Sequence, residues 1–186
     1  MQDGQARHGQ VIGDTVRWLE RAVIGLNLCP FAKAVHVKGQ VHIAVSDATE
    51  VGAVLEVLER EAAALVAMDA QKRDTTLLVV PAGFDDFLLY NDLVRAGERL
   101  VAKRRLQGVL QLASFHPRFV FAGAADGDVA NFTNRAPHPT LHLLREASID
   151  RAVHAFPHPE AIYEANIETL RRIGPDGWQA LGVEAS

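Results

Sequence analysis

The chain has 186 residues, 48% of them hydrophobic and 23% charged, which is the composition of an ordinary globular protein. Its 19 Lys and Arg against 23 Asp and Glu give a formal net charge of −4, which offers nucleic acid or an anionic membrane no overall attraction. No apolar run approaches the ~20 residues that span a bilayer, and the N-terminus lacks the apolar core of a secretion signal. A lone cysteine excludes an internal disulfide, so we expect a cytoplasmic protein without nucleic-acid or membrane partners.

The N-terminal part of the chain predicts a short tail and then a helix. No Pro-, Gly- or Ser-rich linker divides the chain, so we expect a single domain over residues 11–186, preceded by a flexible N-terminus at residues 1–10. Apolar residues recur at helical spacing over residues 11–24, and Gly25 can end that helix.

Two short runs with alternating polarity follow. Residues 35–37 and 41–45 carry valine or isoleucine at every second position, and Lys38, Gly39 and Gln40 separate them. Directly opposed residues of an antiparallel pair share a face of the sheet. The runs therefore predict an edge hairpin with a three-residue loop.

The middle of the chain alternates helices with strands. Residues 51–66 carry one apolar helical face, and residues 75–80 form a continuous apolar run. A second amphipathic helix follows over residues 85–105, and residues 108–115 form the last predicted strand. Connections of helical length between strands favour a parallel sheet.

This order predicts an α/β fold. We expect a mostly parallel central sheet of about four strands with an antiparallel edge hairpin, helices packed on it, and a long irregular excursion after the last strand. Residues 77–80 and 109–112 should be adjacent or near-adjacent parallel strands. A ferredoxin-like fold ranks second, because it needs a hairpin where only one strand is found. A final helix should begin at Pro159 and stop at Gly174-Pro175.

The polar residues of the excursion are the candidate site. Ligands usually bind beyond the carboxyl ends of parallel strands, and a loop this long inside a compact domain is more often functional than decorative. Within residues 114–146, Arg135 and Arg145 could hold an anion, since guanidinium presents a planar fork to carboxylate or phosphate. Asn131 and Asn134 would orient the ligand.

Two histidines are the acid–base candidates. His116 precedes a proline, which favours extended backbone and lets the imidazole project at the end of the strand. Pro139 can begin a helix on which His138, His142 and Glu146 share one stripe, a spacing that also suits a metal ion. The same stripe fits the polar face of an amphipathic helix.

The single thiol, Cys29, has two interpretations. Pro30 and Lys33 would activate it if a helical turn begins there, whereas its apolar neighbours indicate a small buried hydrophobic residue, which we favour. A weaker alternative is a metal site made by Cys29, His116, His142 and Glu146.

Three long segments stand out: LNLCPFAK at residues 26–33, LASFHPRFVFAG at 112–123 and NFTNRAPHPTLHLLRE at 131–146. Together they resemble a bacterial protein family catalogued only as a domain of unknown function, over nearly the whole chain. Where that family is expected to have Ser-Pro-Tyr-Pro, this chain has Ala-Pro-His-Pro, which makes His138 a poor candidate for shared chemistry. The resemblance identifies relatives and implies no mechanism.

The leading functional hypothesis is a small enzyme that takes a small anionic metabolite under the excursion. The alternative is a non-catalytic ligand-binding or regulatory protein whose Arg and Asn side chains lock the loop onto the sheet, since buried polar side chains often satisfy loop carbonyls. No dinucleotide, Walker or nucleophile-elbow motif is present. Neither a cofactor nor an oligomeric state follows from the sequence.

Overall fold

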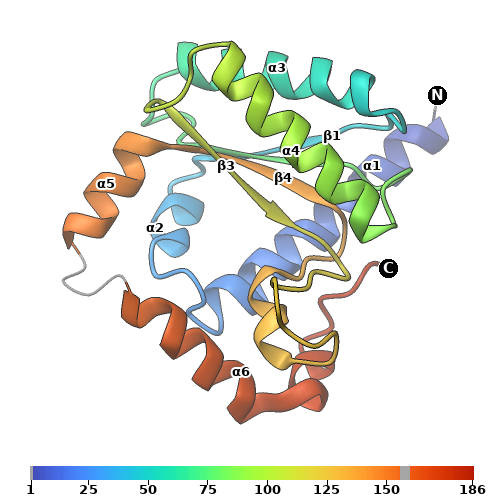
Figure 1. Cartoon of the computed structure of the whole chain (residues 1–186), viewed down its shortest axis with the longest axis vertical. Coiled ribbons are helices and arrows are strands. Elements are labelled where there is room, and N and C mark those ends of the chain that lie inside the picture. The colour runs from blue at the N-terminus through green and yellow to red at the C-terminus, as the bar shows by residue number, and fades with distance from the viewer. Residues whose placement is uncertain (1, 156–159) are drawn as a thin grey trace.

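The protein is built around a four-stranded sheet with helices on both faces (Figure 1). The computed structural model describes residues 2–155 and 160–186. The strands are β1 (Val41–Val45), β2 (Thr75–Val79), β3 (Leu110–Phe115) and β4 (Thr140–Arg145). Their order across the sheet is β1-β2-β4-β3.

The helices form two layers around this sheet. Helices α3 (Val51–Ala67) and α4 (Phe87–Lys103) cover one face. The other face packs against α1 (Gln2–Trp18) with its π-helical continuation η1 (Leu19–Ile24), the 3-10 helix η2 (Val129–Asn134) and α6 (Glu160–Ala180). Two shorter helices complete the described elements: α2 (Ala32–Val37) and α5 (Glu146–Ala155).

Side-chain alternation along the strands separates two cores. In β4, Leu141 and Leu143 are fully buried against α3 and α4, and His142 between them faces the opposite layer. In β2, Leu78 belongs to the first core and Leu77 to the second. Because both faces of the central strands are covered, each has apolar residues at consecutive positions: Leu77, Leu78 and Val79 in β2, and Leu143 and Leu144 in β4.

The strand directions confirm the α/β class but correct the predicted sheet. β1 and β2 are parallel, whereas β4 is antiparallel to both of its neighbours, β2 and β3. β2 and β3 therefore run parallel with one strand between them, as predicted for residues 77–80 and 109–112. The prediction of a mostly parallel sheet was wrong, because β4 inserts between β2 and β3, the two strands that α4 connects.

The predicted edge hairpin was also wrong. Residues 35–37 form the end of the short helix α2, and Gly39, with φ of 68°, follows the helix end. Three alternating residues fit a helix end as well as a strand. β1 instead pairs in parallel with β2, with Val41 opposite Thr75.

The third correction concerns residues 138–146, which were predicted to be helical. Residues 140–145 form β4, and the helix begins only at Glu146, as α5. Leucine favours helices, but hydrogen bonding to strands on both sides overrides this preference. The excursion therefore spans residues 116–139 and connects β3 to β4, rather than following the last strand.

The terminal helices differ from the prediction in their bounds. Helix α1 begins at Gln2 rather than at residue 11. Within α6, Gly174 has φ of 63° and breaks the helix before Pro175, as predicted, although a second helical segment follows. The predicted helix start at Pro159 lies outside the described residues.

Gly97 marks a close approach between α4 and the sheet. A Cβ at this position would lie 2.8 Å from Leu112 Cδ2 and 3.0 Å from Leu58 Cδ2. We expect Gly97→Val to lower the free energy of unfolding by about 1–3 kcal/mol, because the added methyl groups overpack the first core. Urea unfolding measures the loss. The control is Gly52→Val on α3, where nothing lies within 4 Å; an equal effect at both positions would contradict this packing.

Candidate functional site

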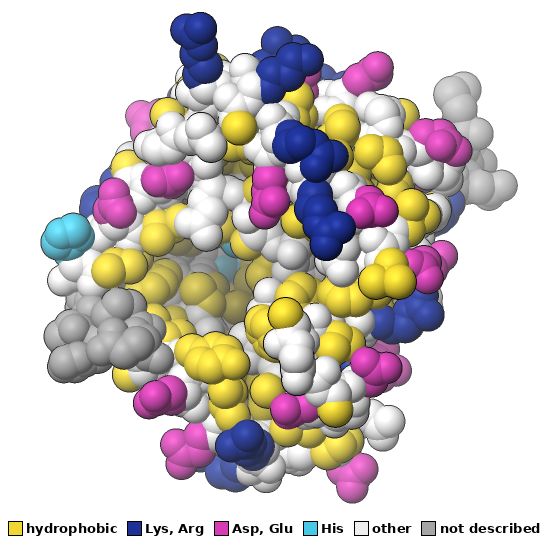
Figure 2. Space-filling model, viewed as in Figure 1, with side chains coloured by type: hydrophobic (Ala, Val, Ile, Leu, Met, Phe, Trp, Pro, Cys, Tyr) yellow, Lys and Arg dark blue, Asp and Glu magenta, His cyan; other side chains and the backbone are white. Residues whose placement is uncertain are grey.

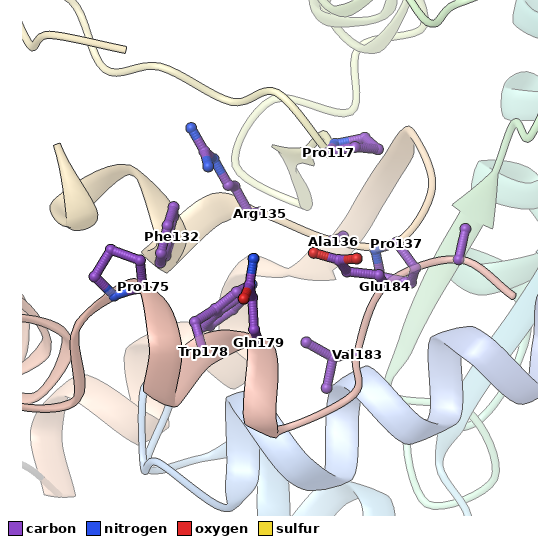
Figure 3. Close-up of a pocket in the computed structure, with 11 residues that line it drawn as sticks. Pro117, Phe132, Arg135, Ala136, Pro137, Pro175, Trp178, Gln179, Val183 and Glu184 are labelled. Atoms are coloured by element: carbon purple, nitrogen blue, oxygen red, sulfur yellow. The ribbon is translucent and has the colours of Figure 1, made fainter. Parts of the chain in front are cut away.

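A pocket of about 450 Å³ lies between the excursion and the C-terminal part of the chain (Figure 3). Phe132, Arg135 and Pro137 contribute from the excursion. Trp178 and Gln179 on α6, and Glu184 beyond it, contribute from the other side. The pocket thus joins segments that are far apart in the sequence.

Helix η2 fixes the excursion side of this pocket. The Asp128 side chain caps the helix by accepting a hydrogen bond from Ala130 N at 2.9 Å. The Phe132 ring is then buried against the Trp178 ring, with their centroids 5.1 Å apart. Arg135 follows directly as the C-cap residue of η2.

Arg135 is a half-buried cation at this pocket. Its Nη2 donates to the carbonyl oxygen of Asp126 at 3.0 Å, and the guanidinium lies 4.5 Å from the centroid of the Phe132 ring. Burial lowers the pKa of Arg135, and the charge of Asp126 partly opposes this. Arg135 takes part in none of the ion pairs found over residues 2–155 and 160–186. A partly desolvated charge without a carboxylate partner is suited to bind an anion.

Asn131 and Asn134 hold the excursion in place instead of facing the pocket. The fully buried Asn131 donates from Nδ2 to Ala125 O at 2.8 Å and accepts from Phe121 N at 3.0 Å. Asn134 Nδ2 donates to Ser114 O at 3.1 Å. These bonds satisfy loop groups that burial would otherwise leave unpaired.

The structure does not bring Arg145 to Arg135. Arg145 ends β4 and donates from Nη2 to the carbonyl oxygens of Met68 at 2.6 Å and Arg73 at 3.1 Å, beyond the C-terminal end of α3. The strand between the two arginines is roughly 17 Å long at the usual rise of about 3.3 Å per residue. The two guanidinium groups therefore do not form one anion site.

His116 uses both ring nitrogens inside the first core. Nε2 lies 2.9 Å from Phe84 O, and Nδ1 accepts from Arg118 N at 3.0 Å, so the ring is neutral with its proton on Nε2. The Tyr90 ring lies 4.9 Å away, between centroids. Burial lowers the pKa of His116. Neither nitrogen is left for proton transfer to a ligand.

His142 lies on the opposite face of the sheet. Its Nε2 is 2.5 Å from Thr75 Oγ1, whose own proton goes to Leu143 O at 2.7 Å, so His142 donates. Burial lowers its pKa to about 4. His142 does not line the pocket and does not contact His116, so the two predicted acid–base residues form no pair.

The alternative metal site does not assemble. Cys29 is half-buried and packs against the second core, and Glu146 accepts from Gly108 N at 3.2 Å at the start of α5. No three or more His, Cys, Asp or Glu side chains gather in a metal-binding arrangement in the part of the chain that the structure describes. A metal site would need Cys29, His116, His142 and Glu146 to lie together, but the sheet separates the segments that carry them.

Sequence reasoning missed the C-terminal side of the pocket and the group that anchors it. Asp14 on α1 is buried and accepts from Ser186 Oγ at 2.6 Å and from His138 Nε2 at 3.1 Å. Burial alone would raise the pKa of the Asp14 carboxyl, but hydrogen bonds from Ser186, His138 and Arg17 hold it below its ordinary value. An acidic residue inside the apolar stripe of the first helix was the available signal.

The second face of the sheet also carries a hollow. Figure 2 shows it between α5 and α6, walled mainly by hydrophobic side chains. Sheet residues on this face, including Ile43 and Phe115, are half-exposed. No ligand class follows from these apolar walls, so the pocket at Arg135 is the better defined site.

These features define a mixed α/β domain with a small polar–aromatic pocket between its excursion and its C-terminal segment. Over residues 10–180 the chain matches the family described as "Protein of unknown function (DUF1415)". It belongs to this family, which confirms the resemblance to a domain of unknown function. Neither the curated proteins nor the solved structures include a match to this chain. Within the described residues, no helix is long and apolar enough to cross a membrane.

Proposed function

We propose that this protein binds a small ligand with an anionic group in the pocket between the excursion and the C-terminal segment, with Arg135 as the cation. The observation that carries the proposal is a half-buried guanidinium at a pocket of about 450 Å³, without a carboxylate partner in the described chain. Small-molecule sites usually measure about 300–1,000 Å³. Binding an anion would compensate the charge that burial disfavours.

The rest of the pocket indicates an apolar body for the ligand. The rings of Phe132 and Trp178 pack together on one side, and Pro117 and Pro137 line the other (Figure 3). Burial of apolar surface against aromatic rings stabilises a bound ring or branched chain. The ligand class is therefore a small carboxylate or phosphate with an apolar part.

The proposal is one of binding, in a cytoplasmic protein, and includes no catalytic step. His116 and His142 contact main-chain and hydroxyl groups away from the pocket lining. This favours the non-catalytic alternative over the small-metabolite enzyme, with Asn131 and Asn134 as structural locks and Arg135 as the ligand contact.

The test is binding of 3-phenylpropanoate, followed by calorimetry and thermal unfolding at constant ionic strength. We expect it to raise the melting temperature of the wild type. Arg135→Lys should weaken binding at least about tenfold, because an ammonium group cannot provide bidentate contact.

Arg145→Lys is the matched control, because it makes the same change outside the pocket. It should lower the melting temperature by itself and leave the response to 3-phenylpropanoate intact. Equal responses in the two variants, or no response of the wild type to either 3-phenylpropanoate or phenylalanine, would overturn the proposed site.

A further inference from the structure

We infer that the ligand of this pocket is a zwitterion, with an ammonium group as well as a carboxylate: an α-amino acid with an apolar side chain. This inference rests on the proposed function and names the ligand class of the same site. Its basis is that Arg135 and Glu184 line one pocket without neutralising each other.

The two charges approach the pocket from different segments. Figure 3 shows the Glu184 carboxylate directed into the pocket from the C-terminal segment, and the Arg135 side chain extending past Phe132 on the excursion side. The Gln179 amide points from α6 into the same space and can donate or accept. No ion pair joins Arg135 to Glu184 anywhere in the described ranges, so neither charge is neutralised by the other.

The backbone under Glu184 is held by α1. Arg17 donates from Nε to Gly182 O at 2.8 Å and from Nη2 to Glu184 O at 3.3 Å, and it pairs with the buried Asp14. The segment that carries Glu184 is thus fastened to the fold. This preorganisation lowers the entropy cost of presenting a carboxylate to a ligand.

Charge balance then selects among ligands. Arg135 is the only Lys or Arg among the described residues that line the pocket, so a dicarboxylate or a nucleotide would keep uncompensated negative charge facing Glu184. A simple amine would meet the opposite problem at Arg135. A zwitterion satisfies both side chains, with its carboxylate toward Arg135, its ammonium toward Glu184 and its side chain toward Phe132 and Trp178.

Three probes with the same phenyl ring separate these possibilities: phenylalanine, 3-phenylpropanoate and 2-phenylethylamine. Calorimetry on the wild type should give the tightest binding for phenylalanine, by at least about tenfold over either singly charged compound. Glu184→Gln should remove this preference, because it weakens phenylalanine binding and leaves 3-phenylpropanoate binding equal or tighter. Glu168→Gln on α6, an exposed acid outside the pocket, should change nothing.

The outcomes distinguish this inference from the proposed function. If 3-phenylpropanoate binds through Arg135 at least as tightly as phenylalanine, and Glu184→Gln has no effect, the zwitterion is overturned and the anion site stands. If none of the probes binds the wild type, both are overturned. Glu184 is exposed, so unchanged melting temperatures should show that its variant remains folded.

Discussion

On acidification from about pH 7 to about pH 4.5, we expect His142 alone to lower the free energy of unfolding by roughly 2–3 kcal/mol. The imidazole is neutral in the folded protein, donates to Thr75 Oγ1 and has its pKa lowered to about 4 by burial. In the unfolded chain the same group has the ordinary value of 6.5. Below about pH 6.5 the unfolded state therefore binds a proton that the folded state does not.

The direction of this effect follows from that difference in proton binding. The contribution of His142 is fully present above the unfolded value of 6.5 and is lost progressively as the pH falls towards the folded value of about 4. His116 also has its pKa lowered by burial, so it adds to the loss in the same direction.

Urea unfolding across this pH range measures the effect, and substitution isolates it. His142→Gln keeps an amide donor near Thr75 and removes the titration, so its stability should depend less steeply on pH. His154→Gln removes an exposed imidazole at the end of α5 and should follow the wild-type profile. Parallel profiles for the wild type and His142→Gln would contradict the burial of a neutral imidazole.

Arg145→Met should destabilise the protein by about 2–4 kcal/mol, because hydrogen bonds from charged groups are among the strongest and their loss removes partners from part-buried acceptors. Arg145 Nη2 donates to the carbonyl oxygens of Leu65, Met68 and Arg73. The last carbonyls of α3 lack a following helical turn to pair with, although Leu65 O also accepts from Met68 N at 3.3 Å. A cation at this end also interacts favourably with the helix dipole.

The same change on an exposed arginine is the control. Arg95 pairs with Asp92 on the surface of α4, where both side chains are 68% exposed, and Arg95→Met should change stability by less than about 0.5 kcal/mol. The loss of stability for Arg145→Lys should be intermediate, because lysine keeps the charge but lacks the planar guanidinium that donates to several acceptors. Urea unfolding measures the effect. If Arg145→Met lowers the free energy of unfolding by less than about 0.5 kcal/mol, the hydrogen bonds from Arg145 do not stabilise the end of α3.

The candidate site could be predicted only in part. The excursion was recognised from its length, and of the polar residues selected in it, Arg135 lines the pocket. His116 and Asn131 were selected for their chemistry, yet their polar atoms are used by main-chain groups of nearby loops. Residue type predicts what a side chain can bind, but only the surrounding backbone decides whether it is already occupied.

No local sequence pattern indicated the residues of the C-terminal side of the pocket. Trp178 follows the predicted helix end at Gly174-Pro175 as one isolated apolar residue, and Glu184 is a single charge after it. Their place beside Phe132 follows from the packing of α6 on η2 and from the contacts that fasten the C-terminal segment to α1.

Local sequence was enough to predict the helical faces of α3 and α4, the buried strand β2, the strand β3 and the break at Gly174, because each depends on periodicity or backbone freedom within a few residues. The tertiary structure decided that residues 140–145 form a strand and not a helix, and with it the sheet's direction and the pocket's position. β4 is a strand because Leu141 and Leu143 on one face enter the first core and its backbone pairs with β2 and β3. Those partners are distant in sequence, so local propensity carries no information about them.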